Sequence, residues 1–249
     1  MIELHHINKT FNPGKANEVQ ALSDVSLHIA KGEFVSLVGS NGSGKTTLLN
    51  IIAGAEFPSE GTVKIAGQDV TTMPEYRRSK WIARVFQNPL GGTAPDLSIL
   101  SNFRLAALRT QRKKLTIGIN DAFKRRVRDQ IAILNMGLEN KLSQPMGTLS
   151  GGQRQALTLL MSVMDHTDIL LLDEPTAALD PRSAKIVMQT AQKLIEEYQL
   201  TTVLITHNLK DAHQYGNRLI QMSEGKIKHD LDTQAKAKLS LSELYDWFG

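Results

Sequence analysis

The sequence predicts an α/β protein whose central sheet is mostly parallel, and three features support this. The apolar run 34–38 is typical of a buried strand, and it leads through a glycine-rich turn into the short helical stretch 47–54. A second apolar run, 169–172, ends at two acidic residues. From residue 168 onward, strand-like and helical segments alternate, which is the pattern of a parallel sheet whose strands are joined by helices.

The N-terminal part of the chain should add a small antiparallel sheet beside this core. Residues 21–29 nearly alternate between apolar and polar side chains and are followed by the turn-forming pair Lys31 and Gly32. The segment 61–67 is another short strand bounded by glycines. We therefore expect residues 1–96 and 166–232 to form this β-subdomain together with the α/β core.

Most of the remaining segments are predicted to be helical. Residues 97–165 lose strand character and show helical spacing, for example at Ile131, Leu134 and Leu138, so they predict a helical subdomain inserted in the core. Beyond it we expect helices at 181–199 and 208–215 and strands at 202–206 and 218–222. Residues 233–249 form a tail with a short helix that should pack on the core. The whole chain, 1–249, is expected to be a single domain.

The composition bounds the class of protein. With 249 residues, 41% of them hydrophobic, the chain can bury one sizeable core. No apolar run approaches the length that crosses a bilayer, and the N-terminus shows neither the basic start nor the apolar stretch of a signal peptide. There is no cysteine, which excludes disulfide and thiol chemistry and is compatible with a reducing compartment.

The net charge of +4 is modest, but basic residues gather in the predicted helical subdomain. A solvated helical face explains such a cluster, and attraction to an anionic membrane surface is the alternative. Nucleic-acid binding is disfavoured because aromatic residues make up 5% of the chain and no recognisable reading motif is present. The cluster comprises Arg104, Arg109, Arg112, Lys113, Lys114, Lys124, Arg125, Arg126 and Arg128.

The turn after residues 34–38 has the pattern of a phosphate-binding loop, in which a glycine and four further residues precede Gly-Lys-Thr. A strand, a glycine loop and a helix in this order direct backbone N–H groups and the positive end of the helix at phosphate. Lys45 would reach the terminal phosphates, and the Thr46 hydroxyl would bind Mg²⁺. A glycine-rich turn that carries a lysine by chance is the alternative. The loop comprises Gly39, Ser40, Asn41, Gly42, Ser43, Gly44, Lys45 and Thr46, and Thr47 follows it.

Two carboxylates, Asp173 and Glu174, follow the apolar run 169–172. Open α/β sheets bind ligands at the carboxyl ends of their strands, which is where these residues should lie. Asp173 would hold Mg²⁺, directly or through water, and Glu174 would orient and polarise an attacking water. A core strand that meets an acidic helix cap is the alternative, since Pro175 and Thr176 come next.

A second glycine-rich helix start occurs at residues 149–153, where Leu149 and Ser150 precede Gly151, Gly152 and Gln153. A serine and two glycines at the start of a helix make another anion-binding end. One nucleotide does not obviously need two such ends from the same chain. A two-chain arrangement would explain the surplus, with each chain lending its second helix start to the nucleotide of the other. An ordinary serine-capped helix is the alternative.

With this motif the chain resembles the ATP-binding subunits of ABC transporters, whose signature is LSGGQ. The resemblance covers nearly the whole chain and implies a P-loop NTPase core of the RecA-like type, a flanking antiparallel β-subdomain and an inserted ABC-type helical subdomain. It also implies roles for four further residues. Phe11 would stack on adenine, Gln87 would sense Mg²⁺ and the membrane partner, Asp180 would touch the opposing subunit, and His207 would lie beside the γ-phosphate.

The resemblance implies that two chains sandwich two ATP molecules head to tail. Both half-sites are intact, so a homodimer with two equivalent active sites is expected. One chain would supply the catalytic residues Lys45, Gln87, Glu174 and His207 and the Mg²⁺-binding residues Thr46, Gln87 and Asp173. The other chain would supply Ser150, Gly151 and Gly152, with Gln153 and Asp180 nearby.

Three segments resemble one branch of bacterial uptake ATPases: 88–95, 154–161 and 206–208. In that branch the partners are a permease related to branched-chain amino-acid permeases and a lipoprotein-type substrate-binding protein outside the cytoplasm. Aromatic amino acids are among the substrates proposed for its members. This resemblance implies a peripheral protein on the cytoplasmic face of the cell membrane, with the permease contacting a groove near Gln87.

We therefore expect the ATP-hydrolysing motor subunit of a bacterial ABC importer for a small solute such as an amino acid. An exporter or lipoprotein-extracting motor remains an alternative, because residues 19–54 and 81–97 resemble that branch as well. A soluble ABC ATPase acting on ribosomes or DNA is a second alternative, although the chain has neither a second cassette nor a long coiled coil. A nucleotide-binding regulator without turnover is disfavoured by the intact Glu174 and His207.

Overall fold

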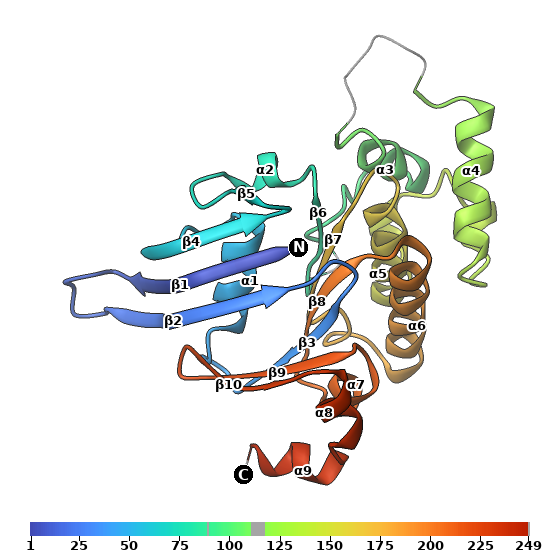
Figure 1. Cartoon of the computed structure of the whole chain (residues 1–249). Coiled ribbons are helices and arrows are strands. Elements are labelled where there is room, and N and C mark those ends of the chain that lie inside the picture. The colour runs from blue at the N-terminus through green and yellow to red at the C-terminus, as the bar shows by residue number, and fades with distance from the viewer. Residues whose placement is uncertain (89, 111–117, 249) are drawn as a thin grey trace. The chain divides into compact units, whose positions relative to one another are not determined.

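The computed structural model describes residues 1–88, 90–110 and 118–248 (Figure 1). Within it the chain divides into two compact units. The first unit comprises Met1–Arg78, Leu171–Glu174 and Leu200–Gly249, and the second comprises Ser79–Leu170 and Pro175–Gln199. Each unit is therefore assembled from segments that are far apart in the sequence.

The first unit contains the antiparallel sheet that the N-terminal hairpins predict. Its strand order is β2-β1-β4-β5, and all of the pairings described are antiparallel. Alternate residues of β1 and β2 are buried, which explains the apolar–polar alternation in the sequence. The strands are β1 (Ile2–Phe11), β2 (Val19–Ile29), β4 (Glu60–Ile65) and β5 (Gln68–Asp69).

The second sheet of this unit has the order β10-β9-β3-β8-β7. The central strand β3 runs parallel to both β8 and β9, and β10 pairs with β9 in the antiparallel sense. All residues of β3, β7 and β8 are buried, which explains why these strands are mostly apolar. The strands are β3 (Phe34–Val38), β7 (Ile169–Asp173), β8 (Thr201–Ile205), β9 (Arg218–Ser223) and β10 (Lys226–Leu231).

Five short helices complete the described part of the first unit. The C-terminal tail packs on the core as the sequence predicts, because Leu244 is fully buried against Val38, Ala212 and Leu219. The helices are α1 (Lys45–Ala53), α2 (Glu75–Arg78), α7 (Leu209–Gln214), α8 (Thr233–Lys238) and α9 (Leu241–Asp246).

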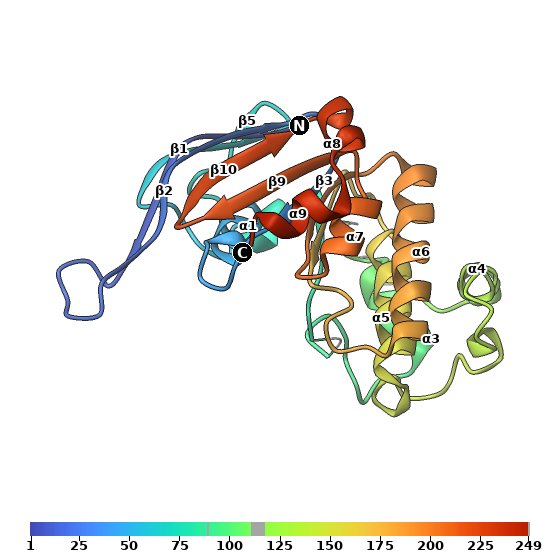
Figure 2. The ribbon, with the colours of Figure 1, turned by 90° about the horizontal axis from the view of Figure 1, so that it is seen from below.

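The second unit is mainly helical. Its strand β6 (Ile82–Val85) follows Trp81, whose carbonyl oxygen accepts hydrogen bonds from the N–H groups of Asp168 and Ile169. Helices α5 and α6 lie side by side (Figures 1 and 2). The described part of segment 97–165 holds three of the helices, and the contacts group β6 and α6 with them. The helices are α3 (Ile99–Ala106), α4 (Asp121–Ala132), α5 (Gly151–Ser162) and α6 (Pro181–Tyr198), with 3-10 turns at Leu138–Asn140 and Met146–Thr148.

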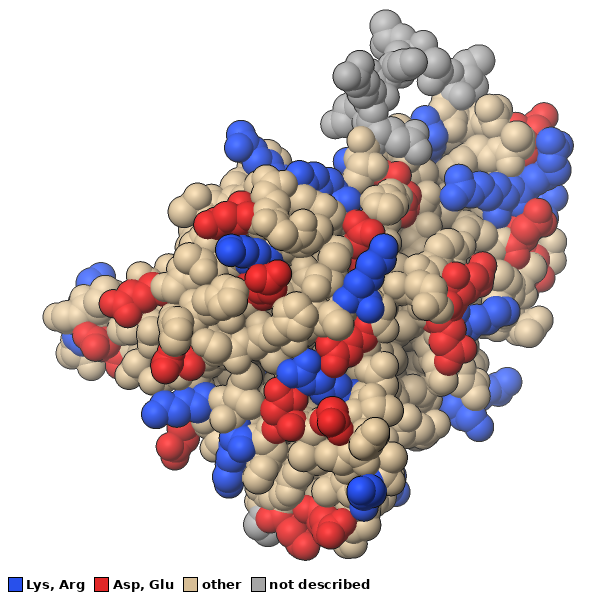
Figure 3. Space-filling view, in the orientation of Figure 1, with Lys and Arg blue, Asp and Glu red and all other residues tan. Residues whose placement is uncertain are grey.

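The basic cluster of the second unit is only partly a solvated face. Lys and Arg side chains gather over α4 in the space-filling view (Figure 3). The Arg109 guanidinium instead donates to the His166 carbonyl and the Thr167 hydroxyl, at 2.7 and 2.5 Å, and burial lowers its pKa. Arg126 donates to the Met164 carbonyl. These two arginines hold loops together within the unit. Arg112, Lys113 and Lys114 lie outside the described residues.

No helix in the described ranges is both long and apolar enough to cross a membrane.

Candidate nucleotide-binding site

The predicted phosphate-binding loop connects β3 to α1 in the first unit. Two of its glycines are required by the geometry. A Cβ at Gly39 would lie 2.4 Å from the Met222 carbonyl oxygen, and one at Gly44 would lie 2.6 Å from that of Ala21. Gly44 also precedes the first helical residue with a φ of 98°, in the left-handed region that favours glycine. The loop therefore folds closely against β2 and β9.

The Lys45 side chain lies under this loop and is 5% exposed. Its Nζ donates to the carbonyl oxygens of Gly39 and Ser40, at 2.8 and 2.9 Å, and to the Ser43 hydroxyl at 3.3 Å. Burial lowers the pKa of Lys45, and the nearby carboxylates of Glu174 and Asp173 oppose that shift. The ammonium is thus held at the loop with two acids facing it.

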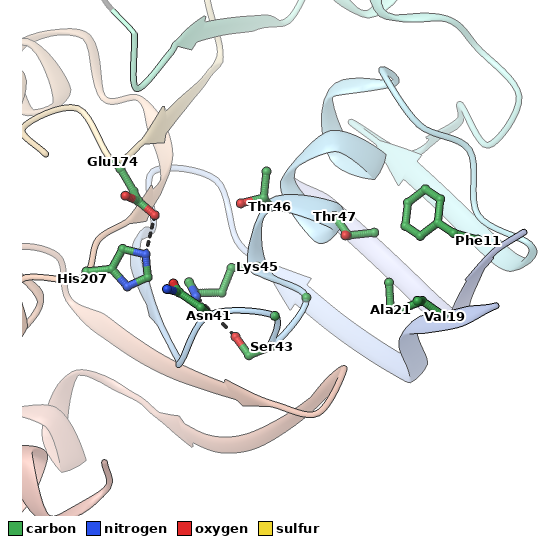
Figure 4. Close-up of a pocket in the computed structure, with 12 residues that line it drawn as sticks. Phe11, Val19, Ala21, Asn41, Ser43, Lys45, Thr46, Thr47, Glu174 and His207 are labelled. Atoms are coloured by element: carbon green, nitrogen blue, oxygen red, sulfur yellow. Dashed lines mark hydrogen bonds and ion pairs between the residues drawn. The ribbon is translucent and has the colours of Figure 1, made fainter. Parts of the chain in front are cut away.

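Glu174 and His207 meet beside the loop, although 32 residues of sequence separate them. The His207 Nε2 lies 2.6 Å from the Glu174 Oε1 (Figure 4). They come together because β7 and β8 are neighbours in the sheet and the Glu174 N–H donates to the Ile205 carbonyl at 3.0 Å. His207 then follows Ile205 by two positions.

The Glu174 backbone is also unusual, since its φ is 47°. Residues with a side chain seldom adopt this left-handed conformation, and it persists where the surroundings fix it. Here the amide is held by Ile205 and the carboxylate by His207. The preceding residue, Asp173, ends β7 and is 8% exposed. The sheet edge therefore presents one acid at the end of the strand and a second turned toward the imidazole.

The loop, the acid and the imidazole line one pocket of about 310 Å³, within the size range of small-molecule sites. Its opposite end is formed by Phe11, Val19 and Ala21, with the Thr47 side chain between the two ends (Figure 4). The Lys9 ammonium lies 4.7 Å from the centre of the Phe11 ring. One end of the pocket can stack an aromatic base, and the other offers backbone N–H groups and a cation to phosphates.

Sequence reasoning missed Val19, Ala21 and Lys9 at the base end. Val19 pairs with Phe11 across the β1–β2 ladder, and Ala21 lies two residues further on the same face. The alternation of β2 was visible in the sequence, but its pairing register with β1 was not.

The signature residues belong to the second unit, where they start α5. The Ser150 hydroxyl accepts the Gln153 N–H at 3.3 Å, and the Gln153 side chain accepts the Ser150 N–H at 3.1 Å, which completes a capping box. Gly151 is exposed. A Cβ at Gly152 would lie 2.4 Å from the Cβ of Ser183 on α6. The structure thus gives Gly152 a packing role between α5 and α6.

Asp180 and Gln87 also belong to the second unit. The Asp180 carboxylate caps α6 by accepting the N–H groups of Arg182 and Ser183, both at 3.1 Å. Hydrogen bonds from Ser183, then from Arg182, lower the pKa of Asp180. Gln87 is exposed two residues after the end of β6. Neither residue lines the pocket of the first unit.

The loop, its lysine and the strand-end acids define a P-loop protein that binds a nucleoside polyphosphate. Comparison with known proteins specifies the family. The model of the ABC transporter family matches residues 22–177. The chain belongs to this family, and it is an ATP-binding, ATP-hydrolysing subunit of an ABC transporter. The expected α/β fold with its P-loop core is thereby confirmed.

Individual relatives extend over most of the chain. A tyrosine transport ATP-binding protein of Clostridioides difficile is 37% identical, and the match covers 100% of this chain and 98% of that protein. The methionine import ATP-binding protein MetN 2 of Enterococcus faecalis is 34% identical over 91% of this chain and 64% of its own length. A dimeric ATP-binding cassette solved in a post-hydrolysis state with ADP and Pi is 31% identical, with a TM-score of 0.80 over 94% of this chain and 99% of that one.

Proposed function

We propose that the Glu174–His207 pair is the hydrolytic centre of this ATPase. The observation that carries the proposal is the 2.6 Å contact between the two side chains at the loop end of the pocket. Among the described residues that line the pocket, Glu174 is the only acid. Its carboxylate can accept a proton from a water that attacks the terminal phosphate and can stabilise the positive charge that develops on that water. His207 holds that carboxylate in one orientation and presents its second ring nitrogen to the phosphate.

The remaining pocket residues bind and orient the nucleotide. Phe11 stacks on the base, and Lys45, released from the loop carbonyls, binds the terminal phosphates. The loop amides and the start of α1 stabilise the phosphate charge. Phosphoryl transfer depends mainly on such positioning and charge stabilisation, so these few groups suffice.

Thr46 and Asp173 would hold Mg²⁺. A hydroxyl and a carboxylate are ligands that Mg²⁺ prefers, and it usually takes only one or two of them besides phosphates and waters. Bound Mg²⁺ would neutralise phosphate charge. Gln87 is proposed as a further ligand.

The second half of each site would come from a second copy of the chain. In this arrangement Ser150, Gly151 and Gly152 lend the start of α5 to the nucleotide of the partner, and Asp180 lies at the contact. Support comes from the solved relative, which is dimeric. Head-to-tail pairing also explains why one chain carries two glycine-rich helix starts.

We propose that the dimer drives an integral-membrane permease that imports a small solute such as an amino acid, with an extracytoplasmic binding protein delivering it. The names of the tyrosine and methionine relatives support this substrate class. The chain would then lie on the cytoplasmic face of the membrane through the permease. The segment 88–95 after Gln87 is the proposed contact, although residue 89 lies outside the described ranges.

The hydrolytic role is tested with Glu174→Gln, which removes the negative charge and the proton-accepting carboxylate and keeps the size of the side chain. ATP affinity should persist while hydrolysis falls by about 10²–10⁴-fold. Glu197→Gln, at an exposed position of α6, is the matched control and should hydrolyse ATP normally. Wild-type turnover of Glu174→Gln would remove Glu174 from the mechanism.

The import role is tested by co-purifying the chain with its membrane subunit and reconstituting the complex in vesicles. ATP on the side of this chain should drive labelled amino acid toward that side, from the side where the binding protein delivers it. Movement of cargo to the opposite side of the membrane, without a binding protein, would favour the exporter alternative.

A further inference from the structure

A buried lysine in the C-terminal tail contacts the same helix that follows His207. Lys236 of α8 is 6% exposed, and its Nζ donates to the carbonyl oxygens of Tyr215 and of Gly216, the latter at 2.8 Å. Within the described part of the chain it forms no ion pair with an acid. Burial lowers its pKa to about 8. Burying an ammonium without a counter-ion costs free energy of folding. A buried lysine that bonds to these two carbonyls is therefore expected to have a structural role.

The two carbonyls lie at the end of α7. Tyr215 is the residue at which this helix ends, and its carbonyl also accepts the Ser36 hydroxyl at 2.7 Å. The carbonyl end of a helix carries partial negative charge and leaves its last oxygens without partners inside the helix. The Lys236 amine therefore provides hydrogen-bond donors for the carbonyl oxygens at the C-terminal end of α7.

The N-terminal end of α7 leads directly to the proposed hydrolytic centre. Asn208 caps the helix by accepting the N–H groups of Lys210 and Asp211, at 3.0 and 3.3 Å. The Asn208 N–H in turn donates to the Thr206 hydroxyl at 3.0 Å. His207 is the residue between these two, so its backbone is fixed by the position of α7.

Other tail residues hold the same helix. The His213 Nε2 lies 2.8 Å from the Leu239 carbonyl oxygen. Leu244 packs on Ala212 of α7 and also on Val38, the residue just before the phosphate-binding loop. The tail thus contacts α7 through Lys236, Leu239 and Leu244.

We infer that Lys236 is a positioning residue for ATP hydrolysis: by holding the end of α7 against the tail, it fixes His207 at the Glu174 carboxylate. The inference rests on the proposed role of His207. Lys236 lies on α8, at the C-terminal end of α7, and does not line the pocket. It therefore acts through His207 and not on the nucleotide. Its loss should therefore affect turnover and leave nucleotide binding in place.

The test compares Lys236→Met with Lys238→Met, which removes the same charge from an exposed position of the same helix. Steady-state hydrolysis is measured on the full chain, and the imidazole resonances of the seven histidines are followed by NMR. The His207 resonance is assigned by its absence in His207→Ala. Misplacing a catalytic group by about 1 Å costs up to roughly 100-fold, so Lys236→Met should lose about 10- to 100-fold in kcat. Its KM for ATP should stay within about twofold, because ground-state binding is unchanged.

The same variant should shift the His207 resonance, while Lys238→Met should match the wild type in both measurements. A wild-type kcat or an unmoved His207 resonance in Lys236→Met would overturn the inference. If Lys236→Met does not fold, His213→Phe, which loses the bond to Leu239, should give the same loss of kcat and the same shift. A His207→Ala protein with normal kcat would refute the proposed role of His207. The shift of the His207 resonance in Lys236→Met reports independently on whether Lys236 fixes the position of His207.

Discussion

Arg78 should be one of the most important single side chains for the stability of the first unit. It is fully buried, and its guanidinium makes five hydrogen bonds to the backbone carbonyl oxygens of Met73, Ile51, Ile52, Val70 and Thr71. Two of these acceptors lie in the last turn of α1, the helix that begins at the phosphate-binding loop. Replacement by Met keeps much of the volume and removes every donor.

The cost of Arg78→Met can be worked out from these contacts. The carbonyls of Ile51 and Val70 keep backbone donors, Gly54 and Met73. Three others, those of Ile52, Met73 and Thr71, lose the guanidinium, at about 2 kcal/mol for each buried or part-buried acceptor left unpaired. Burial lowers the pKa of Arg78 to about 10, so removing the cation relieves roughly 3 kcal/mol. The net loss of unfolding free energy is therefore about 3 kcal/mol.

The assay is urea unfolding followed by circular dichroism. Arg77→Met, at the exposed neighbouring position of α2, is the matched control and should change the unfolding free energy by less than about 0.5 kcal/mol. If Arg78→Met and Arg77→Met unfold at the same urea concentration, the assignment of stability to the buried guanidinium is wrong.

Three further predictions concern the pocket and the tail. The pKa of Lys236 is about 8 in the folded chain, and its ordinary value is 10.5. Between these pH values the folded chain has released a proton that the unfolded chain still holds. The free energy of unfolding therefore rises with pH in this range. Urea titrations should show wild type gaining roughly 3 kcal/mol over Lys236→Met between pH 7.5 and 10.5; parallel curves would contradict this. Phe11→Ala should weaken ATP binding by about 1–3 kcal/mol in calorimetry while Phe11→Tyr retains it, and equal affinities would exclude base stacking. Gly44→Ala, which places a Cβ 2.6 Å from the Ala21 carbonyl, should reduce both thermal stability and nucleotide affinity, and an unchanged melting temperature would show that the loop relaxes freely.

The sequence predicted the features that depend on local pattern. The strands β3, β7 and β8 are mostly apolar, and the expected helices at 181–199 and 208–215 agree with α6 and α7 to within one residue at each end. The loop residues were predictable because a glycine pattern specifies a backbone shape. The nearness of Glu174 and His207 followed from the resemblance and not from spacing.

Contacts that depend on tertiary packing were not predictable in the same way. Arg78 stands in the sequence Glu-Tyr-Arg-Arg, which looks like a solvated turn, yet it is fully buried. Lys236 likewise stands in a polar stretch of the tail. Both cations bind backbone carbonyls, and a carbonyl is present at every residue, so no sequence pattern marks the acceptor. Only the fold shows which helix end lies opposite each cation.

The contact between Gly152 and Ser183 has a consequence for how the signature motif should be probed. Any side chain at Gly152 would collide with α6, so its substitution perturbs the second unit before any nucleotide is involved. At Gly151 a Cβ would meet only the end of the Leu179 side chain, at 3.4 Å, which is ordinary contact. The two neighbouring glycines are therefore separable. Gly151→Ala isolates the surface that the signature offers to a partner, whereas Gly152→Ala measures the packing of two helices.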